Sequence, residues 1–200
     1  DLKKITKSIF LALKNQQWHE PYARLGMALF IGSLPILLAG MCIKFFWPDF
    51  EHSPLQGIPA IATTSICMGL ILGLAEQTGQ RAKSIKQVSK KDGLMIGMGQ
   101  MLALIPGMSR SGITLTTSLM QGWKRQDAAR FSFLLGIPAI SISGLVELKE
   151  AFQNTHLLSS LPLFIGIISA ATFSWLSIDW LLKFLQSHST WIFVTYRLVF

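Results

Sequence analysis

Residues 93–123 contain one charged side chain, Arg110, in the middle of an otherwise uncharged stretch. The hydroxyl groups of Ser109, Ser111 and Thr114 lie close to it in the sequence. Arginine binds the oxygens of a phosphate group through two parallel hydrogen bonds, which lysine cannot do. These residue types therefore indicate a binding site for an anion, and a phosphate group fits them best.

Backbone groups of the same loop add further donors for an anion. Gly107 and Gly112 leave backbone N–H groups accessible, and a helix that begins near Gly112 directs its positive end into the loop. The loop lacks the Gly-Lys-Ser/Thr ending of a nucleotide-binding P-loop. The alternative is that Arg110 pairs with a carboxylate of another helix or extends to a membrane interface.

The rest of the chain is too poor in charge for a soluble protein. Only 14% of its 200 residues are charged and the mean hydropathy is +0.46, whereas soluble domains are about 25% charged. Charge-free stretches recur at about the length that crosses ~30 Å of hydrocarbon. This pattern excludes a secreted, disordered or ordinary cytosolic protein and predicts an all-α polytopic integral membrane protein. We expect one membrane domain over residues 1–200, with spans at about 25–46, 57–76, 129–147 and 157–182 and a partial span at 191–200.

Residues 93–122 do not fit a further straight span. Their two apolar stretches would form helices of only ~20 and ~16 Å, about half a bilayer each, on either side of Pro106 and Gly107. One interrupted span and one re-entrant hairpin both fit this pattern. Lys and Arg are enriched in cytoplasmic loops, and only a hairpin returns residues 124–130 to the side of the basic loop at 77–92. We therefore expect a re-entrant helix hairpin.

The net charge of +8 does not indicate a nucleic-acid-binding protein, because the positive charges lie in short loops between apolar stretches. Cys42 and Cys67 lie inside apolar runs, and we interpret them as small buried residues without metal or disulfide spacing. Trp123 lies near a predicted span boundary, which is typical of an interfacial anchor.

Three other features of the apolar segments concern polar side chains and glycines. Gln100 could orient Arg110 or a phosphate group, or could only form a hydrogen bond between helices. Glu76 could approach a metal ion, but we expect it to lie at a solvated helix end. Gly93 and Gly97 have the spacing of small residues that suits close helix packing.

A family resemblance is carried by the run PGMSRSGIT at Pro106–Thr114, by Gln100 before it, and by residues 128–135 and Pro138 after it. These residues resemble the undecaprenyl-diphosphate phosphatase family, also called the bacitracin-resistance family. The resemblance implies inverted repeats, each with a re-entrant hairpin, in the bacterial inner membrane. It also implies hydrolysis of undecaprenyl diphosphate to undecaprenyl phosphate and phosphate, which recycles the lipid carrier of cell-wall synthesis. A divalent cation, Mg or Ca, is the implied cofactor.

On this resemblance we assign Arg110, Ser109 and Thr114 as catalytic residues and Gly107, Ser111, Gly112 and Gln100 as substrate-binding residues. Arg110 would stabilise negative charge as the P–O bond breaks. Ser109 would either attack phosphorus or donate a hydrogen bond. The expected partners are an isoprenoid diphosphate lipid and membrane lipids, and the sequence leaves open whether the protein is a homo-oligomer. The rival function is a membrane transporter for an anionic or lipid-phosphate substrate.

The chain departs from the family pattern in its N-terminal part. The family's second motif, a pair of glutamates with a Pro-Val-Ser-Ser-Thr-Gly-His run, does not occur before Pro106. We therefore expect no metal ligands in these 200 residues. We also expect the 200-residue chain to be inactive when it is expressed alone.

Overall fold

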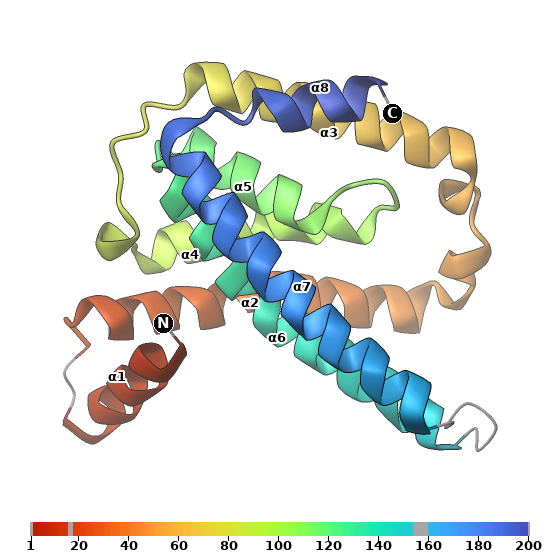
Figure 1. Ribbon diagram of the computed structural model, residues 1–200, viewed down its shortest axis with the longest axis horizontal. Helices are drawn as coiled ribbons and strands as arrows, with labels where there is room; N and C mark the ends of the chain where they lie inside the picture. Colours follow the sequence, from red (N-terminus) through yellow and green to blue (C-terminus); the bar gives the residue numbers. More distant parts are fainter. Residues whose placement is uncertain (1, 16–17, 154–159, 200) are drawn as a thin grey trace.

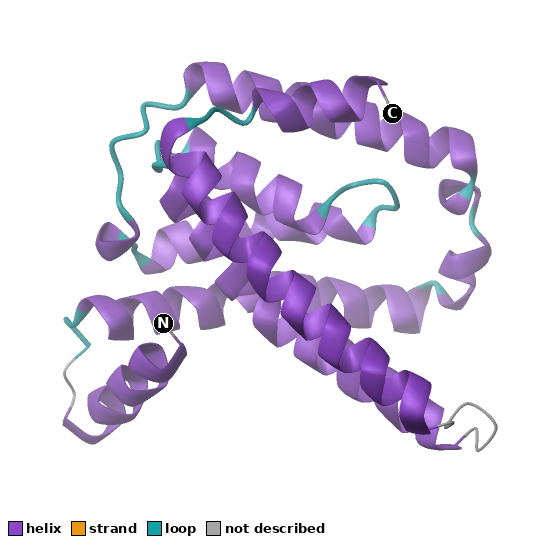
Figure 2. Ribbon diagram, in the orientation of Figure 1, coloured by secondary structure: helices purple, strands orange, loops and turns teal. Residues whose placement is uncertain are grey.

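The computed structural model describes residues 2–15, 18–153 and 160–199. Helices joined by loops make up this part of the chain, and no strand occurs in it (Figure 2). The helices are α1 (Leu2–Asn15), α2 (Pro21–Phe46), α3 (Ile58–Thr78), α4 (Lys90–Met101), α5 (Arg110–Met120), α6 (Arg125–Gln153), α7 (Ser160–Ser187) and α8 (Trp191–Val199), with short 3-10 turns η1 (Pro48–His52), η2 (Pro54–Gln56), η3 (Ile85–Gln87) and η4 (Leu102–Leu104). The prediction of an all-α protein is confirmed.

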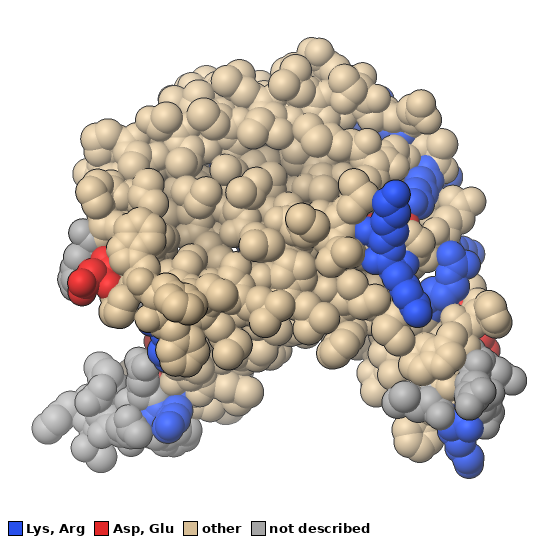
Figure 3. Space-filling model, turned by 180° about the vertical axis from the view of Figure 1, so that it is seen from behind, with Lys and Arg blue, Asp and Glu red and all other residues tan. Residues whose placement is uncertain are grey.

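Within the described residues, four helices are long and apolar enough to cross a membrane. They are α2, α3, the Arg125–Lys149 part of α6 and the Pro162–Ser187 part of α7. The α4–α5 pair lies between α2 and α3, while α8 runs along α3 and α6 pairs with α7 (Figure 1). Lys and Arg side chains gather toward one side of the face in Figure 3, and its centre is free of charge. The chain is thus a multi-pass membrane protein.

Glycines bring α4 against α2 with almost no space between the backbones. A Cβ atom built on Gly93 would lie 2.2 Å from the carbonyl oxygen of Ala28, and one on Gly97 would lie 2.2 Å from that of Gly32. A larger side chain at either position would separate the two helices, because backbone atoms cannot move aside locally. The predicted close packing at Gly93 and Gly97 is confirmed, and it fixes α4 in the centre of the molecule.

The start of α4 is set by a capping box. The Ser89 hydroxyl accepts a hydrogen bond from the Asp92 N–H at 3.2 Å, and an Asp92 carboxylate oxygen accepts one from the Ser89 N–H at 2.8 Å. Lys83 Nζ lies 2.6 Å from the other carboxylate oxygen. Burial raises the pKa of Asp92, but the hydrogen bonds from Lys83 and Ser89 outweigh it and hold the pKa below its usual value.

This lowered pKa predicts a pH dependence. The contribution of ionised Asp92 to stability is complete above the ordinary carboxyl pKa of about 4 and is lost as the pH falls through the lower pKa of the folded state. We expect Asp92→Asn to cost about 1 kcal/mol or more at pH 7, and the difference from wild type to shrink below about pH 4. Thermal unfolding of both proteins in detergent across pH 3–7 measures it. A difference that stays constant down to about pH 3 would contradict the assignment.

The segment that follows α5 lies beside the loop that precedes α4. Gly122 has a φ of +79°, and the N–H groups of Gly122 and Trp123 donate to the carbonyls of Leu119 and Ser118 at 2.9 and 3.1 Å, which closes the helix in a Schellman motif. The Lys83 N–H donates to the Gly122 carbonyl at 2.9 Å, and the Lys124 N–H donates to the Lys83 carbonyl at 2.9 Å. Two backbone hydrogen bonds therefore join the segments that flank the hairpin.

Two expectations about side-chain exposure are wrong. Trp123 is completely buried, with its ring 5.2 Å from that of Phe131, because the segment containing Lys83 lies beside it in the backbone bridge. It is therefore a core residue and not an interfacial anchor. Cys67 is exposed on α3, and Cys42 is exposed on α2, where it lines an apolar hollow together with Leu94 and Leu102.

Glu76 also differs from the expectation of a solvated helix end. Its side chain is only 1% exposed and accepts hydrogen bonds from Arg81, Arg125 and Thr190, with the Thr190 hydroxyl at 2.8 Å. A carboxylate can be buried here because two guanidinium groups and a hydroxyl satisfy its oxygens. Glu76 thereby ties α3 to the start of α6 and to the connection between α7 and α8.

Candidate functional site

The loop that contains the motif is held against α3. The Thr64 hydroxyl lies 2.5 Å from the Pro106 carbonyl oxygen, to which it donates a hydrogen bond. Gly107 has a φ of +86°, and a Cβ atom at this position would lie 2.2 Å from Thr64 Oγ1 and 2.4 Å from the Ile61 carbonyl oxygen. Only glycine satisfies both constraints. Gly107 therefore shapes the turn that leads into α5.

Two serines lie at the beginning of α5, where the helix has its positive end. Ser109 is the N-cap, and its hydroxyl oxygen accepts a hydrogen bond from the Gly112 N–H at 3.1 Å. The hydroxyl oxygens of Ser109 and Ser111 are 3.4 Å apart. Because Ser109 accepts from the backbone, its own O–H proton remains available to donate. Hydroxyl groups and unpaired backbone N–H groups at a helix N-terminus are well suited to bind an anion.

Thr114 lies beneath this loop and is completely buried. Its hydroxyl contacts the Arg110 carbonyl oxygen at 2.9 Å and the Ser132 hydroxyl at 2.5 Å. Ser132, on α6, also donates to the Ser111 carbonyl oxygen at 3.2 Å. The structure thus places Thr114 where it fastens the first turn of α5 to α6. Ser132 was not singled out from the sequence, although it lies inside the segment that carries the family resemblance.

The side chain of Arg110 extends from the first turn of α5 toward α6. A Cβ atom built on Gly136 would lie 1.7 Å from Arg110 Nη1, so the guanidinium occupies the space that this glycine leaves open. Nη1 is buried and has no hydrogen-bond partner in the described part of the chain. No carboxylate among the described residues forms an ion pair with Arg110. A buried cationic donor without a protein partner suits an anionic ligand.

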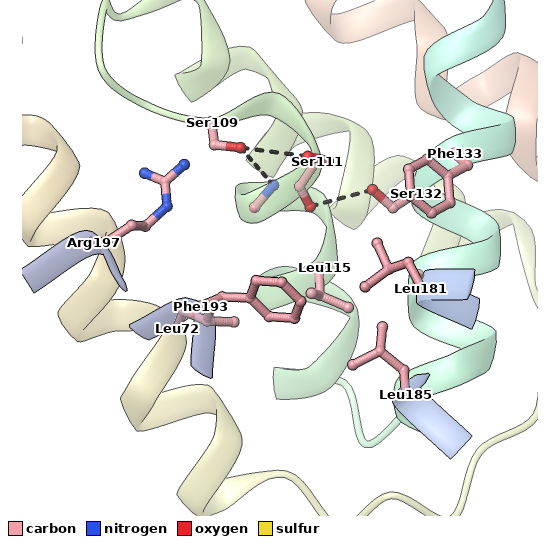
Figure 4. Close-up of a pocket in the computed structure, with 12 residues that line it drawn as sticks. Leu72, Ser109, Ser111, Leu115, Ser132, Phe133, Leu181, Leu185, Phe193 and Arg197 are labelled. Carbon is pink, nitrogen blue, oxygen red and sulfur yellow. Dashed lines mark hydrogen bonds between the residues drawn. The ribbon is translucent and has the colours of Figure 1, made fainter. Parts of the chain in front are cut away.

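A cavity of about 150 Å³ opens beside the loop (Figure 4). Its polar end is formed by Ser109, Ser111, Gly112 and Arg197, a residue of α8 that belongs to the family resemblance but to which the sequence assigned no role. Its remaining walls come from α3, α5, α6, α7 and α8: Leu72, Leu115, Ala129, Ser132, Phe133, Leu181, Leu185 and Phe193. The cavity is therefore amphiphilic, with hydroxyls and a guanidinium at one end and aliphatic and aromatic side chains at the other.

A sequence profile of the family described as "Bacitracin resistance protein BacA" matches residues 1–200. The chain belongs to the BacA family. The resemblance inferred from the motif at Pro106–Thr114 is confirmed.

Three relatives in this family are named undecaprenyl-diphosphatase. Two are from Prochlorococcus marinus strains MIT 9303 and MIT 9313, and each is 62% identical to this chain over 200 residues. The chain covers 68% of the length of the first relative and 67% of the length of the second. The third, from Synechococcus sp. strain WH7803, is 61% identical over 200 residues, and the chain covers 70% of its length. In each comparison the whole of this chain is matched.

Gln100 is the remaining predicted site residue of this BacA-family chain. It lies on α4 and is completely buried, and neither its Nε2 nor its Oε1 has a hydrogen-bond partner in the described part of the structure. No hydrogen bond joins it to Arg110 among the described residues. A buried amide with both groups unsatisfied is costly, so a ligand or an ordered water is the natural partner.

The divalent cation that the resemblance implies does not fit the residues around this loop. Mg²⁺ and Ca²⁺ are bound mainly by carboxylate and carbonyl oxygens. The loop of this BacA-family chain offers hydroxyls and guanidinium groups, and the residues 93–123 contain no Asp, Glu or His. The described residues contain no cluster of three or more His, Cys, Asp or Glu that could hold a metal ion.

Proposed function

We propose that this protein is a membrane phosphatase that hydrolyses undecaprenyl diphosphate to undecaprenyl phosphate and phosphate. The observation that carries the proposal is the motif loop. In it, the buried Arg110 guanidinium has no carboxylate partner and the hydroxyl groups lie beside an amphiphilic cavity. Relatives named undecaprenyl-diphosphatase, up to 62% identical over the whole chain, support it. Regeneration of the lipid carrier for cell-wall synthesis would follow from this reaction.

The described residues supply charge stabilisation for such a reaction. Hydrolysis breaks the bond between the terminal phosphorus and the bridging oxygen, so negative charge grows on the leaving monophosphate and on the phosphoryl oxygens. We assign three kinds of donor to this charge: the Ser109 hydroxyl and the N–H groups at the start of α5, which lie at the cavity, and Arg110, whose guanidinium lies beside Gly136 and does not line the cavity. Thr114 and Ser132 do not contact the substrate in this proposal. Their hydroxyl groups hold the backbone of Arg110 and Ser111 in place.

The decisive experiment measures phosphate release from undecaprenyl diphosphate in detergent by the purified intact protein, by which we mean this chain together with a part that carries the family's second motif, supplied in cis or as a co-expressed partner. We expect one phosphate per substrate molecule, with activity lost in Arg110→Ala. Undecaprenyl phosphate serves as the control substrate and should release much less. A transporter, which the relatives do not favour, would release no phosphate, and that result would refute the proposed function.

We also propose that α4 and α5 form a re-entrant hairpin in the bacterial inner membrane. The backbone hydrogen bonds between the segments at Lys83 and Lys124 support this, because a straight crossing would place these segments on opposite faces of the bilayer. The basic character of both segments supports a cytoplasmic position for the open end of the hairpin.

This topology predicts the accessibility of single cysteines. Lys90 and Lys124 are both exposed, and we expect Lys90→Cys and Lys124→Cys to react with a membrane-impermeant thiol reagent from the cytoplasmic side only. The background must lack Cys42 and Cys67, because both are exposed. Asp49→Cys, in the acidic loop, is the control and should react from the other side. Labelling of positions 90 and 124 from opposite faces would contradict the hairpin and would indicate an interrupted span that crosses the membrane.

A further inference from the structure

Arg197 reaches the motif loop from a helix that the motif does not include. Its Nη1 donates to the Ser65 hydroxyl at 3.3 Å and to the Gly107 carbonyl oxygen at 3.5 Å. Both bonds are long and both acceptors are neutral, and no carboxylate in the described part of the chain pairs with this guanidinium. Most of its five N–H donors therefore remain for another partner.

The packing of α8 on α3 places Arg197 at this position. A Cβ atom built on Gly69 would lie 3.2 Å from the Cβ atom of Arg197, so the glycine allows α8 to approach α3 closely. Phe193 lies one helical turn before Arg197 and lines the same cavity. One face of α8 thus presents an aromatic ring and a cation to the cavity.

Figure 4 shows the Arg197 guanidinium facing Ser109 across the polar end of the cavity. Arg110 extends in another direction, toward Gly136 on α6. Two arginines from different helices therefore flank the motif loop, of which Arg197 lines the cavity and Arg110 does not, and no described carboxylate pairs with either. A diphosphate has two phosphate groups and carries more negative charge than a monophosphate. Two separate guanidinium groups suit it better than one.

We propose that Arg197 is a second phosphate-binding residue, which together with Ser109 holds one phosphate group of an isoprenoid diphosphate. Phe193 and the other apolar walls then contact the first isoprene units. This inference rests on the proposed function and deepens it. It assigns the preference for a diphosphate over a monophosphate to a residue outside the motif.

A purely structural role for Arg197 predicts a different result. In that case its contacts with Ser65 and Gly107 would only fasten α8 to the loop, and removal of the Ser65 hydroxyl would have a similar effect. Ser65→Ala tests this role. Lys183→Gln is the matched control for the loss of a positive charge, since Lys183 is exposed on α7 and pairs with Asp179 at 2.6 Å.

The experiment compares Arg197→Gln, Arg197→Lys, Ser65→Ala and Lys183→Gln in the intact protein in detergent. The readouts are KM and kcat for undecaprenyl diphosphate, inhibition by inorganic diphosphate and by inorganic phosphate, and thermal unfolding. We expect Arg197→Gln to raise both KM and the inhibition constant of inorganic diphosphate at least about tenfold, with a smaller effect on inorganic phosphate. Arg197→Lys should recover part of the loss, and Lys183→Gln should match wild type. An unchanged KM and inhibition constant in Arg197→Gln would overturn the inference, and so would an equal loss in Ser65→Ala.

Direct binding of inorganic diphosphate separates this inference from the proposed function. If the wild-type protein releases no phosphate from the lipid, the proposed function fails. Calorimetric binding of inorganic diphosphate then still tests Arg197. Weaker binding by Arg197→Gln than by wild type would support an anion site at this residue. Equal binding, or no binding by either protein, would overturn it.

Discussion

Arg110→Lys is expected to reduce kcat for undecaprenyl diphosphate by a factor on the order of 100, while the protein still inserts and folds. Lysine keeps the positive charge but cannot form two parallel hydrogen bonds to a phosphate group. Arg110 Nη1 is buried without a hydrogen-bond partner among the described residues, so the wild-type side chain has a donor that is available to a ligand. Phosphate release measured at saturating substrate gives kcat directly.

Ser111→Ala is the matched comparison for this variant. It removes one neutral donor among several, which is worth about 1 kcal/mol, so its activity should fall by about tenfold or less. Thermal unfolding in detergent should be close to wild type for both variants, because Ser111 is exposed and lysine at position 110 keeps a long side chain with a positive charge. Near-normal turnover by Arg110→Lys would show that Arg110 does not bind the phosphate group through both of its donors.

Glu76→Ala is expected to be the most destabilising of the changes considered. The carboxylate is almost completely buried, and its removal leaves the Arg125 guanidinium without its ion-pair partner. Loss of one partner of a buried ion pair costs about 3–5 kcal/mol. For a protein of this size that corresponds to roughly 10 °C in Tm. Thermal unfolding in detergent is the measurement.

Two further variants show whether burial is the cause. Asp179→Asn breaks the exposed ion pair with Lys183 on α7 and should cost less than about 1 kcal/mol. Glu76→Ala combined with Arg125→Ala removes both charges of this ion pair, so the double variant should be more stable than the sum of the two single losses predicts. Equal effects of Glu76→Ala and Asp179→Asn would contradict the buried network.

Chemistry that lies within one segment could be predicted from the sequence. Arg110 and its neighbouring hydroxyls are adjacent along the chain, and the spacing of Gly93 and Gly97 follows from helix geometry alone. Both predictions depend on local distances, which the order of residues determines. The position of α5 between α3 and α6 does not follow from such distances.

The residues whose roles sequence reasoning missed act across long separations. Arg197 approaches Gly107, ninety positions earlier, and Thr190 binds Glu76 across 114 positions. Glu76 ends an apolar helix, where a carboxylate usually reaches water, and nothing near it in the sequence indicates that Arg125 and Thr190 cover it. Trp123 is buried for a similar reason, because the segment containing Lys83 returns to lie beside it. Only tertiary packing reveals these contacts.

The backbone hydrogen bonds between Lys83 and the segment at Gly122 and Lys124 also set an order of events during biosynthesis. Residues 84–121 form a ring closed by these bonds, so the ring cannot close until Lys124 has left the ribosome. By then α2 and α3 have been synthesised, and their facing surfaces can receive the hairpin as one unit. The ring that carries the motif therefore closes only after the two helices that enclose it have been synthesised, and truncation of the nascent chain before Gly122 leaves the ring open.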